Sequence, residues 1–232
     1  MENRFHKIVP VHRLQSLFRN EMSILYGGFG GIGTPPTLID YILSLDVNNL
    51  TLIGNDTGFP DIGIGKIVSA KRAKKLIVSH IGSNPNAGKQ LHSGELDIEF
   101  SPQGILMERI RAGGSGIAAF LSDIGVEHET VSQSKQRVIL QNKEYLLETG
   151  LTADVAIVYA KVADEFGNVI YDKSARNSNP LVAMAGNVTI VEAEEIVPLG
   201  ALQSEEIITP GVFVDFVIQS SGVNWAWAWE KT

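Results

Sequence analysis

The sequence contains no cysteine. This absence excludes disulfide bonds, thiol nucleophiles and cysteine-ligated metal centres. Basic residues are also scarce, with 19 lysines and arginines against 26 acidic residues, and they form no cluster, so the net charge of −7 argues against a general affinity for nucleic acid or anionic lipid. No uncharged apolar run approaches the length of a membrane span, and the first residues lack the apolar core of a secretion signal. We therefore expect a cytoplasmic protein that binds neither nucleic acid nor a membrane.

The rest of the composition is typical of a folded protein, with 44% hydrophobic and 19% charged residues. Apolar runs of strand length alternate with segments of helical periodicity, and no internal repeat is apparent. We predict strands at residues 23–26, 49–53, 74–80, 95–100, 154–160 and 188–192, helices at 11–18, 37–45, 64–73 and 102–111, and a hairpin over 136–148. This order predicts an α/β fold with a single open, mostly parallel sheet flanked by helices and a small hairpin excursion.

Residues 27–33, G-G-F-G-G-I-G, form a glycine loop that follows the first strand and precedes two prolines. Glycines let a ligand approach main-chain N–H groups, and the first turn of the next helix adds further unpaired N–H groups. Thr34 is expected to cap that helix, with Pro35 at its first position. The pattern predicts a site for a phosphate or a developing oxyanion.

In a parallel sheet, the segments that follow the strands meet at the carboxyl edge, which is where open α/β proteins bind ligands. We expect residues 27–33, 55–56 and 82–94 to gather there. His80 would end a strand beside this edge, where a structural role is the simpler interpretation. No H-E-x-x-H spacing, G-x-S-x-G elbow or Walker lysine loop occurs, and no metal site is indicated.

Gly28, Gly30 and Gly33 also spell G-x-G-x-x-G, and Asp56 follows the second strand as a ribose-binding acid would. This pattern is typical of a dinucleotide site. The two prolines that follow the loop and the position of Asp56 within a polar turn weigh against it. Purely structural glycines and another anionic or acyl ligand remain open alternatives at this point.

Several spaced blocks carry a resemblance to a known family. They are G-G-F-x-x-x-G-x-P at 27–35, N-D-T at 55–57, G-S-N-P at 82–85, S-G-E-L at 93–96, S-P-Q-G through E-R-I-R-A-G-G at 101–114, and S-A-R-N at 174–177. In these blocks the sequence resembles the A (α) subunits of family I CoA-transferases, the 3-oxoacid, acetoacetate, butyrate and acetate group. The resemblance covers residues 14–218, and its departures, Glu21, Tyr26 and Ser178, leave the loop glycines intact.

The resemblance implies a ping-pong exchange of CoA between a short-chain acyl-CoA and a carboxylate, with CoA as a substrate and no tightly bound cofactor. In such two-subunit enzymes the nucleophilic glutamate belongs to the B (β) subunit, so no catalytic residue is expected on this chain, and the family suggests an α2β2 assembly. By resemblance, the CoA-side loop comprises Gly27, Gly28, Phe29, Gly30, Gly31, Ile32 and Gly33, with Asn55 and Gln90 lining the active site. A dinucleotide-binding oxidoreductase subunit and a non-catalytic CoA-binding protein are the alternatives.

The last residues lie outside this resemblance. We expect residues 1–218 to form the α-subunit domain and residues 219–232 to form a tail. Trp225, Trp227 and Trp229 alternate with alanines there, so an extended backbone would place three indoles on one face. Such a face is costly to leave in water, and packing against the same chain or a sister subunit is the favoured explanation over a substrate lid.

Overall fold

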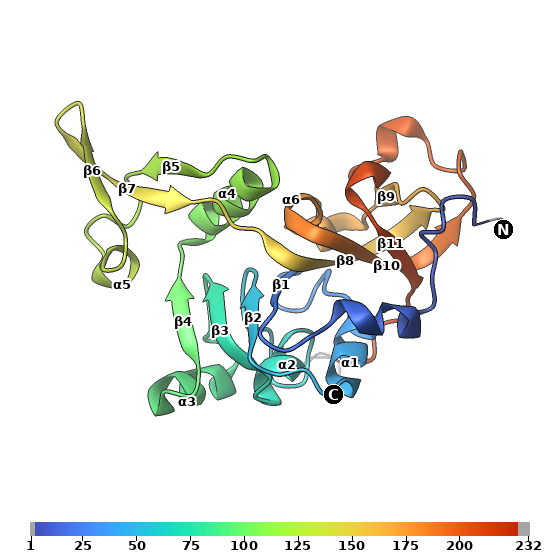
Figure 1. The fold of residues 1–232 in the computed structure, drawn as a ribbon, viewed down its shortest axis with the longest axis horizontal. Helices are drawn as coiled ribbons and strands as arrows, with labels where there is room; N and C mark the ends of the chain where they lie inside the picture. The colour runs from blue at the N-terminus through green and yellow to red at the C-terminus, as the bar shows by residue number, and fades with distance from the viewer. Residues whose placement is uncertain (1–2, 227–232) are drawn as a thin grey trace.

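The computed structural model describes residues 3–226 and contains one large, mostly parallel sheet (Figure 1). Its strands run in the order β11-β10-β8-β1-β2-β3-β4, and the short β9 pairs antiparallel with β8. The strands span Ser23–Tyr26 (β1), Leu50–Ile53 (β2), Ala73–Val78 (β3), Asp97–Phe100 (β4), Ala153–Asp164 (β8), Val169–Ile170 (β9), Gly186–Val197 (β10) and Phe216–Gln219 (β11). The predicted α/β class with a mostly parallel sheet is confirmed.

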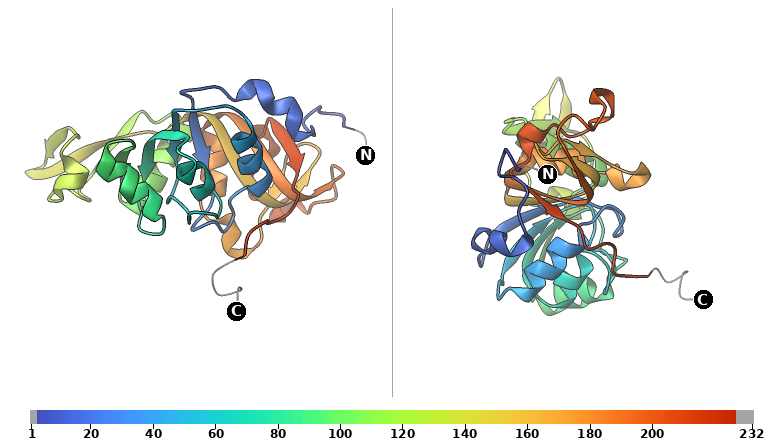
Figure 2. Two further views of the ribbon diagram at one scale, coloured as in Figure 1. Left: turned by 90° about the horizontal axis from the view of Figure 1, so that it is seen from below. Right: turned by 90° about the vertical axis from the view of Figure 1, so that its right-hand side faces the viewer.

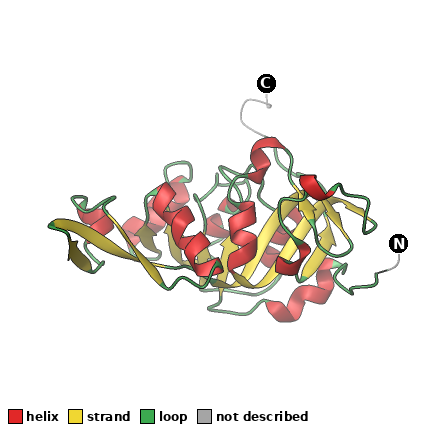
Figure 3. Ribbon diagram, turned by 90° about the horizontal axis from the view of Figure 1, so that it is seen from above, coloured by secondary structure: helices red, strands yellow, loops and turns green. Residues whose placement is uncertain are grey.

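Helices cover both faces of this sheet (Figure 3). The helices are α1 (Pro36–Ser44), α2 (Gly65–Ser69), α3 (Pro85–Ser93), α4 (Gln103–Gly114) and α6 (Asn179–Ala185), with short 3-10 turns η1 (Val11–Leu17), η2 (Lys173–Arg176), η3 (Ser204–Glu206) and η4 (Gly211–Phe213). One apolar core joins the sheet to η1, α1, α2 and α3, and a second joins it to α4 and α6. Strands buried on both faces read as continuous apolar runs, as in β1, where Ile24, Leu25 and Tyr26 are all buried.

The strand order reverses at β1. The chain builds outward from β1 through β2 and β3 to β4, then crosses over and adds β8, β10 and β11 on the other side of β1. Such a switch point leaves a crevice at the carboxyl ends of the two central strands, because the following connections diverge to opposite faces. The glycine loop leaves β1 at this position.

A small antiparallel sheet lies at one end of the molecule (Figure 2, left). Its strands are β5 (Ala119–Ser122), β7 (Lys143–Thr149) and β6 (Arg137–Leu140), in the order β5-β7-β6, and α5 (Glu129–Ser132) precedes β6. The predicted hairpin is therefore correct but belongs to a three-stranded sheet. Its turn residues are Gln141 and Asn142, with φ of 50° and 61°, because a two-residue hairpin turn requires left-handed backbone at both positions.

Buried ion pairs join this small sheet to the main one. The Arg109 side chain on α4 is 5% exposed, lies 2.7 Å from a carboxylate oxygen of Glu99 on β4, and lies 3.7 Å from Glu148 on β7. Glu148 is fully buried and also pairs with Lys135 at 2.6 Å. Charges taken out of water must be compensated locally, so these groups fix α4 against both sheets.

One local prediction, the extent of the helix at 64–73, was wrong. The helix predicted over 64–73 ends at Ser69, because Lys71 takes a left-handed φ of 56° and the chain then enters β3 at Ala73. Ser101 does not cap α4: the N-cap position belongs to Pro102, and the buried Ser101 hydroxyl has no hydrogen-bond partner in the described chain. None of the helices among the described residues combines the length and apolarity needed to cross a membrane.

The C-terminal segment crosses the start of α1 after β11 ends. The Ser221 N–H donates to the Thr37 hydroxyl at 2.9 Å, the Asn224 amide donates to Asp40, and the Lys66 ammonium lies 5.6 Å from the ring centroid of Trp225. Trp225 thus packs against its own chain. Trp227 and Trp229 lie outside the described residues, and the domain boundary after residue 218 stays a prediction.

Candidate functional site

The glycine loop is a tight hairpin. Phe29 and Ile32 exchange both backbone hydrogen bonds at 3.0 Å, and Gly30 and Gly31 between them have φ of 57° and 97°. Glycine is needed at both positions because side chains rarely adopt such angles. The Phe29 and Ile32 side chains are 55% and 44% exposed, so the tip of the loop presents apolar carbon to the outside.

Most N–H groups of the loop are already bonded within the protein. Gly27 donates to the Ile157 carbonyl at 3.1 Å and Gly28 to the Asn177 side chain at 3.1 Å. Gly30 donates to the Asp56 carboxylate at 2.8 Å. Within the described chain, only the N–H groups of Gly31 and Gly33 among the loop glycines lack such a partner. The expectation of an open cradle of N–H donors is therefore wrong for most of the loop.

The N-terminus of α1 is also occupied. The N–H groups of Thr37 and Leu38 each donate at 3.0 Å to the two carboxylate oxygens of Glu192, a residue of β10 with 0% exposure. Burial raises the pKa of Glu192, and hydrogen bonds from Ser220, Thr37 and Leu38 offset part of that rise. Thr34 does not cap the helix, whose N-cap is Pro35. The predicted anion site at this helix end is thus filled by an internal carboxylate.

A second hairpin stands beside the first. Residues 58–63 read G-F-P-D-I-G, which matches G-F-G-G-I-G at 28–33, and Phe59 pairs with Ile62 as Phe29 pairs with Ile32. The two hairpins touch: a Cβ built on Gly63 would lie 3.4 Å from the Gly31 Cα. The expectation of no internal repeat overlooked this short repeat, which places equivalent loops after the adjacent strands β1 and β2.

Asp56 holds both hairpins together. Its carboxylate accepts hydrogen bonds at 2.8 Å from the N–H groups of Gly30 and Gly58 and from the Asn55 side-chain amide. The side chain is 5% exposed, so it is not available to bind a ribose. This geometry overturns the dinucleotide interpretation of Asp56, because the acid is used to fix the loops.

Two asparagines before and within α6 hold the other side of the loop. Asn177 accepts from the Gly28 N–H and donates to the Ile32 carbonyl at 2.9 Å, and it adopts an unusual backbone conformation with φ of 21°. Asn179 donates to the Gly33 carbonyl at 2.9 Å. A Cβ on Gly27 would lie 1.7 Å from the Asn179 Oδ1, so this position requires glycine. The loop is rigidly positioned by its surroundings.

Two cavities flank the loop at the carboxyl edge of the sheet. The larger cavity, of about 500 Å³, is lined by Phe29, Gly30, Asn55, Asp56, Phe59, Ser79, His80, Ser83 and Gln103. The smaller cavity, of about 260 Å³, is lined by Gly28, Phe29, Asn55, Gln103, Met107, Asn177, Ser178 and Leu181. They share Phe29, Asn55 and Gln103, which form the wall between them. The predicted gathering of the loops at this edge is confirmed for residues 27–33 and 55–56.

A pair of side-chain amides stands on the shared wall. Gln103 Nε2 donates to Asn55 Oδ1 at 2.8 Å, and Asn55 in turn donates to Asp56 and accepts from Ser79 at 3.2 Å. Asn55 is 4% exposed, whereas Gln103 is exposed at the first turn of α4. The Gln103 amide is therefore oriented from behind and keeps hydrogen-bonding capacity toward a ligand. Sequence reasoning missed Gln103, although its position just after a predicted strand was the available signal.

Gln90 lies elsewhere. It belongs to α3, is 4% exposed, and its Nε2 donates to the Val68 carbonyl at 2.9 Å. It lines neither of the two cavities beside the glycine loop. The structure gives this glutamine a role in joining α3 to α2, and its predicted place beside the substrate stays a prediction.

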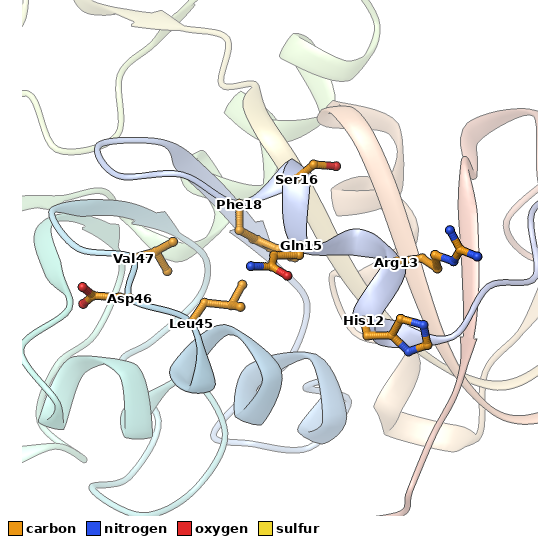
Figure 4. A pocket seen from close by; sticks show the side chains of 8 residues that line it. All are labelled: His12, Arg13, Gln15, Ser16, Phe18, Leu45, Asp46 and Val47. Atoms are coloured by element: carbon orange, nitrogen blue, oxygen red, sulfur yellow. The ribbon is translucent and has the colours of Figure 1, made fainter.

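Another cavity, of about 650 Å³, lies between η1 and the C-terminal end of α1 (Figure 4). His12 and Arg13 stand at one end of it and Asp46 at the other, so its titratable side chains do not converge. Asp46 instead pairs with Arg72 at 3.2 Å. The described residues also contain no group of three or more histidine, aspartate or glutamate side chains that could hold a metal ion. At the glycine loop, by contrast, Asn55, Asp56 and Gln103 come together beside the cavities.

Comparison with known proteins agrees with this architecture. The family model "Coenzyme A transferase" matches residues 10–220. A "Probable coenzyme A transferase subunit alpha" of Bacillus subtilis is 53% identical over 97% of this chain and 99% of its own length. An "Acetoacetyl-CoA:acetate/butyrate CoA transferase alpha subunit" of Clostridium acetobutylicum is 46% identical over 92% of this chain and 97% of its own.

Among solved structures, an acyl-CoA transferase of Escherichia coli O157:H7 in a thioester complex with CoA superimposes with a TM-score of 0.83 at 21% identity. The match covers 94% of this chain and 49% of that one, so the chain spans about half of the longer enzyme. At this identity the likeness shows the shared fold. The family model and the two curated relatives establish that the chain is a member of the coenzyme A transferase family.

Proposed function

We propose that this chain is the α subunit of a short-chain acyl-CoA:carboxylate CoA-transferase of the acetate, butyrate and acetoacetate type. The activity for which the Clostridium relative is named supports the substrate class, and the subunit names of both relatives support a separate partner chain. The proposed partner is a B (β) subunit in an α2β2 assembly, working in the cytoplasm on acyl-CoA and short-chain carboxylates.

One observation carries the proposal that the nucleophile lies on the partner. Among the described residues that line the two cavities, the only carboxylate is Asp56, and three hydrogen bonds at 2.8 Å hold it as a structural acceptor. A nucleophilic carboxylate needs a free oxygen aimed at the reacting carbon. The described residues at this edge therefore supply apolar side chains and amide groups but no free carboxylate, which is what we expect of one half of a shared active site.

The exchange that we propose begins when a glutamate of the B subunit attacks the thioester carbonyl. A C–O bond forms and the C–S bond breaks, which gives an acyl-glutamyl anhydride and the CoA thiolate. The thiolate then attacks the glutamyl carbonyl, releases the donor carboxylate and leaves a glutamyl-CoA thioester. An acceptor carboxylate reverses these steps and departs as the new acyl-CoA. Each step exchanges one carboxylate or thiolate for another, so no external acid or base is consumed.

The glycine loop is proposed to contact CoA on its α-subunit side. Its exposed apolar tip, Phe29 and Ile32, suits the pantetheine arm, whereas most of its N–H groups are already bonded. Asn55 and Gln103 are proposed to face the thioester, because the Gln103 amide is held in place by Asn55 and remains exposed. Preorganised amide donors of this kind stabilise a developing oxyanion.

The test is co-expression. The full chain purified alone should show no exchange between acetoacetyl-CoA and acetate, and the chain purified with its B subunit should show it. When the assembly is incubated with acyl-CoA and no acceptor, the B subunit should gain the mass of CoA less one water. Transfer by the isolated chain would contradict the half-site proposal, and CoA binding without turnover in the assembled pair would favour a non-catalytic CoA-binding protein.

A further inference from the structure

The smaller cavity has an apolar lining drawn from three separate elements. Phe29 comes from the glycine loop, Met107 from the middle of α4 and Leu181 from the first turn of α6. Met107 and Leu181 are partly buried and pack against the core beneath them. The cavity measures about 260 Å³, about half the volume of its neighbour.

The polar groups at this cavity are largely satisfied by the protein itself. Asn177 Oδ1 accepts from the N–H groups of Gly28 and Ser178, and its Nδ2 donates to the carbonyls of Ile32 and Ser174. A ligand entering the smaller cavity therefore meets carbon on one side and already bonded groups on the other. This surface suits a hydrocarbon chain, because unpaired polar atoms of a ligand would lose their bonds to water there.

The larger cavity offers a different chemistry. Its lining includes the polar side chains of Ser79, His80 and Ser83 in addition to Asp56. Because Phe29 and Phe59 also line it, the larger cavity has a mixed lining, and the smaller cavity is the more apolar of the two; the wall of Phe29, Asn55 and Gln103 separates them. A thioester placed at this wall would have distinct environments for its two substituents.

We propose, on the basis of the function proposed above, that the smaller cavity is the acyl subsite and that Met107 and Leu181 limit the chain length of the acyl group. Gln103 and Met107 stand four residues apart on α4 and so lie on one face of that helix, about 6 Å apart along its axis. A thioester carbonyl at the Gln103 amide would direct the acyl chain toward Met107.

The dimensions fit a short chain. Three consecutive bonds of an extended chain span about 3.8 Å, so the distance of about 6 Å from Gln103 to Met107 corresponds to about four or five bonds. The volume of the cavity, about 260 Å³ and about half that of its neighbour, also favours a small group. Butyryl and acetoacetyl groups fit these limits, and a six-carbon chain would press against Met107 and Leu181.

The experiment uses the full chain assembled with its B subunit. Acetate is the acceptor, and kcat/KM is measured for propionyl-CoA, butyryl-CoA and hexanoyl-CoA as donors. Met107→Ala and Leu181→Ala should each raise the hexanoyl-to-butyryl ratio about tenfold, because one methylene in an apolar pocket alters discrimination by about 10- to 200-fold. Met107→Phe should lower the butyryl-to-propionyl ratio.

Leu91→Ala is the matched control, since Leu91 is a 37% exposed leucine on α3, outside both cavities. It should leave all three donor ratios unchanged. Opposite changes in specificity from the smaller and the larger side chain at Met107 would not arise from a general loss of packing.

The outcomes separate the two proposals. A wild-type assembly that transfers no acyl group would overturn the proposed function itself. A wild-type assembly that is active, with donor ratios in all three variants within twofold of wild type, would overturn the acyl subsite alone. Equal losses for every donor would also overturn it, because they would show that Met107 and Leu181 serve only packing. If an alanine variant fails to fold, the Met107→Phe ratio decides.

Discussion

Asp56→Asn tests whether one carboxylate fixes both hairpins. The acid has one oxygen that accepts from the Gly30 N–H and the Asn55 amide, and another that accepts from the Gly58 N–H, all at 2.8 Å. Asparagine has one oxygen and one NH2 group in place of these two oxygens. Either orientation of the new amide must therefore point a donor at a donor.

The size of the expected loss of stability follows from the number of donors that lose their acceptor. If the amide oxygen replaces Oδ2, the bonds to Gly30 and Asn55 survive and the Gly58 N–H is orphaned; the opposite orientation orphans two donors. The first orientation costs less, and one buried unsatisfied donor costs about 1–3 kcal/mol. With the loss of charge assistance in the surviving bonds, we expect unfolding free energy to fall by about 2–3 kcal/mol. Asp56→Ala, which orphans all three donors, should cost more.

Urea unfolding of the full chain, followed by circular dichroism, measures this difference. Asp61→Asn is the matched control, because Asp61 is an exposed acid at the tip of the second hairpin and should change stability by no more than about 0.5 kcal/mol. A cost for Asp56→Asn equal to that of the control would refute the reasoning. So would a cost for Asp56→Ala below that of Asp56→Asn.

Two further predictions concern charges outside the site. Arg109→Met should lower unfolding free energy by about 3 kcal/mol, because it leaves the fully buried Glu148 without one of its cations, whereas Arg111→Met, which removes an exposed pair, should cost far less in the same urea titration. Hydrogen bonding from the Ser23 backbone lowers the pKa of Asp154, so its stabilisation is present above the unfolded pKa of about 3.9 and is lost as pH falls below it. Asp154→Asn should therefore cost about 1 kcal/mol at pH 7 and progressively less as pH falls through the lowered pKa of the folded state, and a pH-independent cost in thermal unfolding would contradict this assignment.

The sheet could be predicted because the sequence features that specify its strands and turns lie within a few consecutive residues. A strand buried on both faces needs an apolar run, and a hairpin with left-handed backbone needs Gly30 and Gly31, so both features are visible in a few consecutive letters. The same holds for the carboxyl edge, whose position follows from the order of strands and helices.

The contacts that complete the site are not local. Glu192 meets the N-terminus of α1 across 155 residues of sequence, and no pattern near either residue indicates the pair. Gln90 and Gln103 show a subtler limit. Both follow predicted strands, but only Gln103 opens its helix, whereas Gln90 lies beyond the first turn of α3 and faces α2. The distance from the end of the preceding strand is the sequence feature that distinguishes the two glutamines.

The carboxylate at the start of α1 has a consequence for selectivity. A free helix N-terminus beside a glycine loop attracts any small phosphate, and cells contain inorganic phosphate and nucleotides in abundance. Here Glu192 supplies the negative charge from within the protein, so that helix end repels such competitors. This edge of the sheet therefore lacks the free helix N-terminus that a phosphate group would otherwise bind.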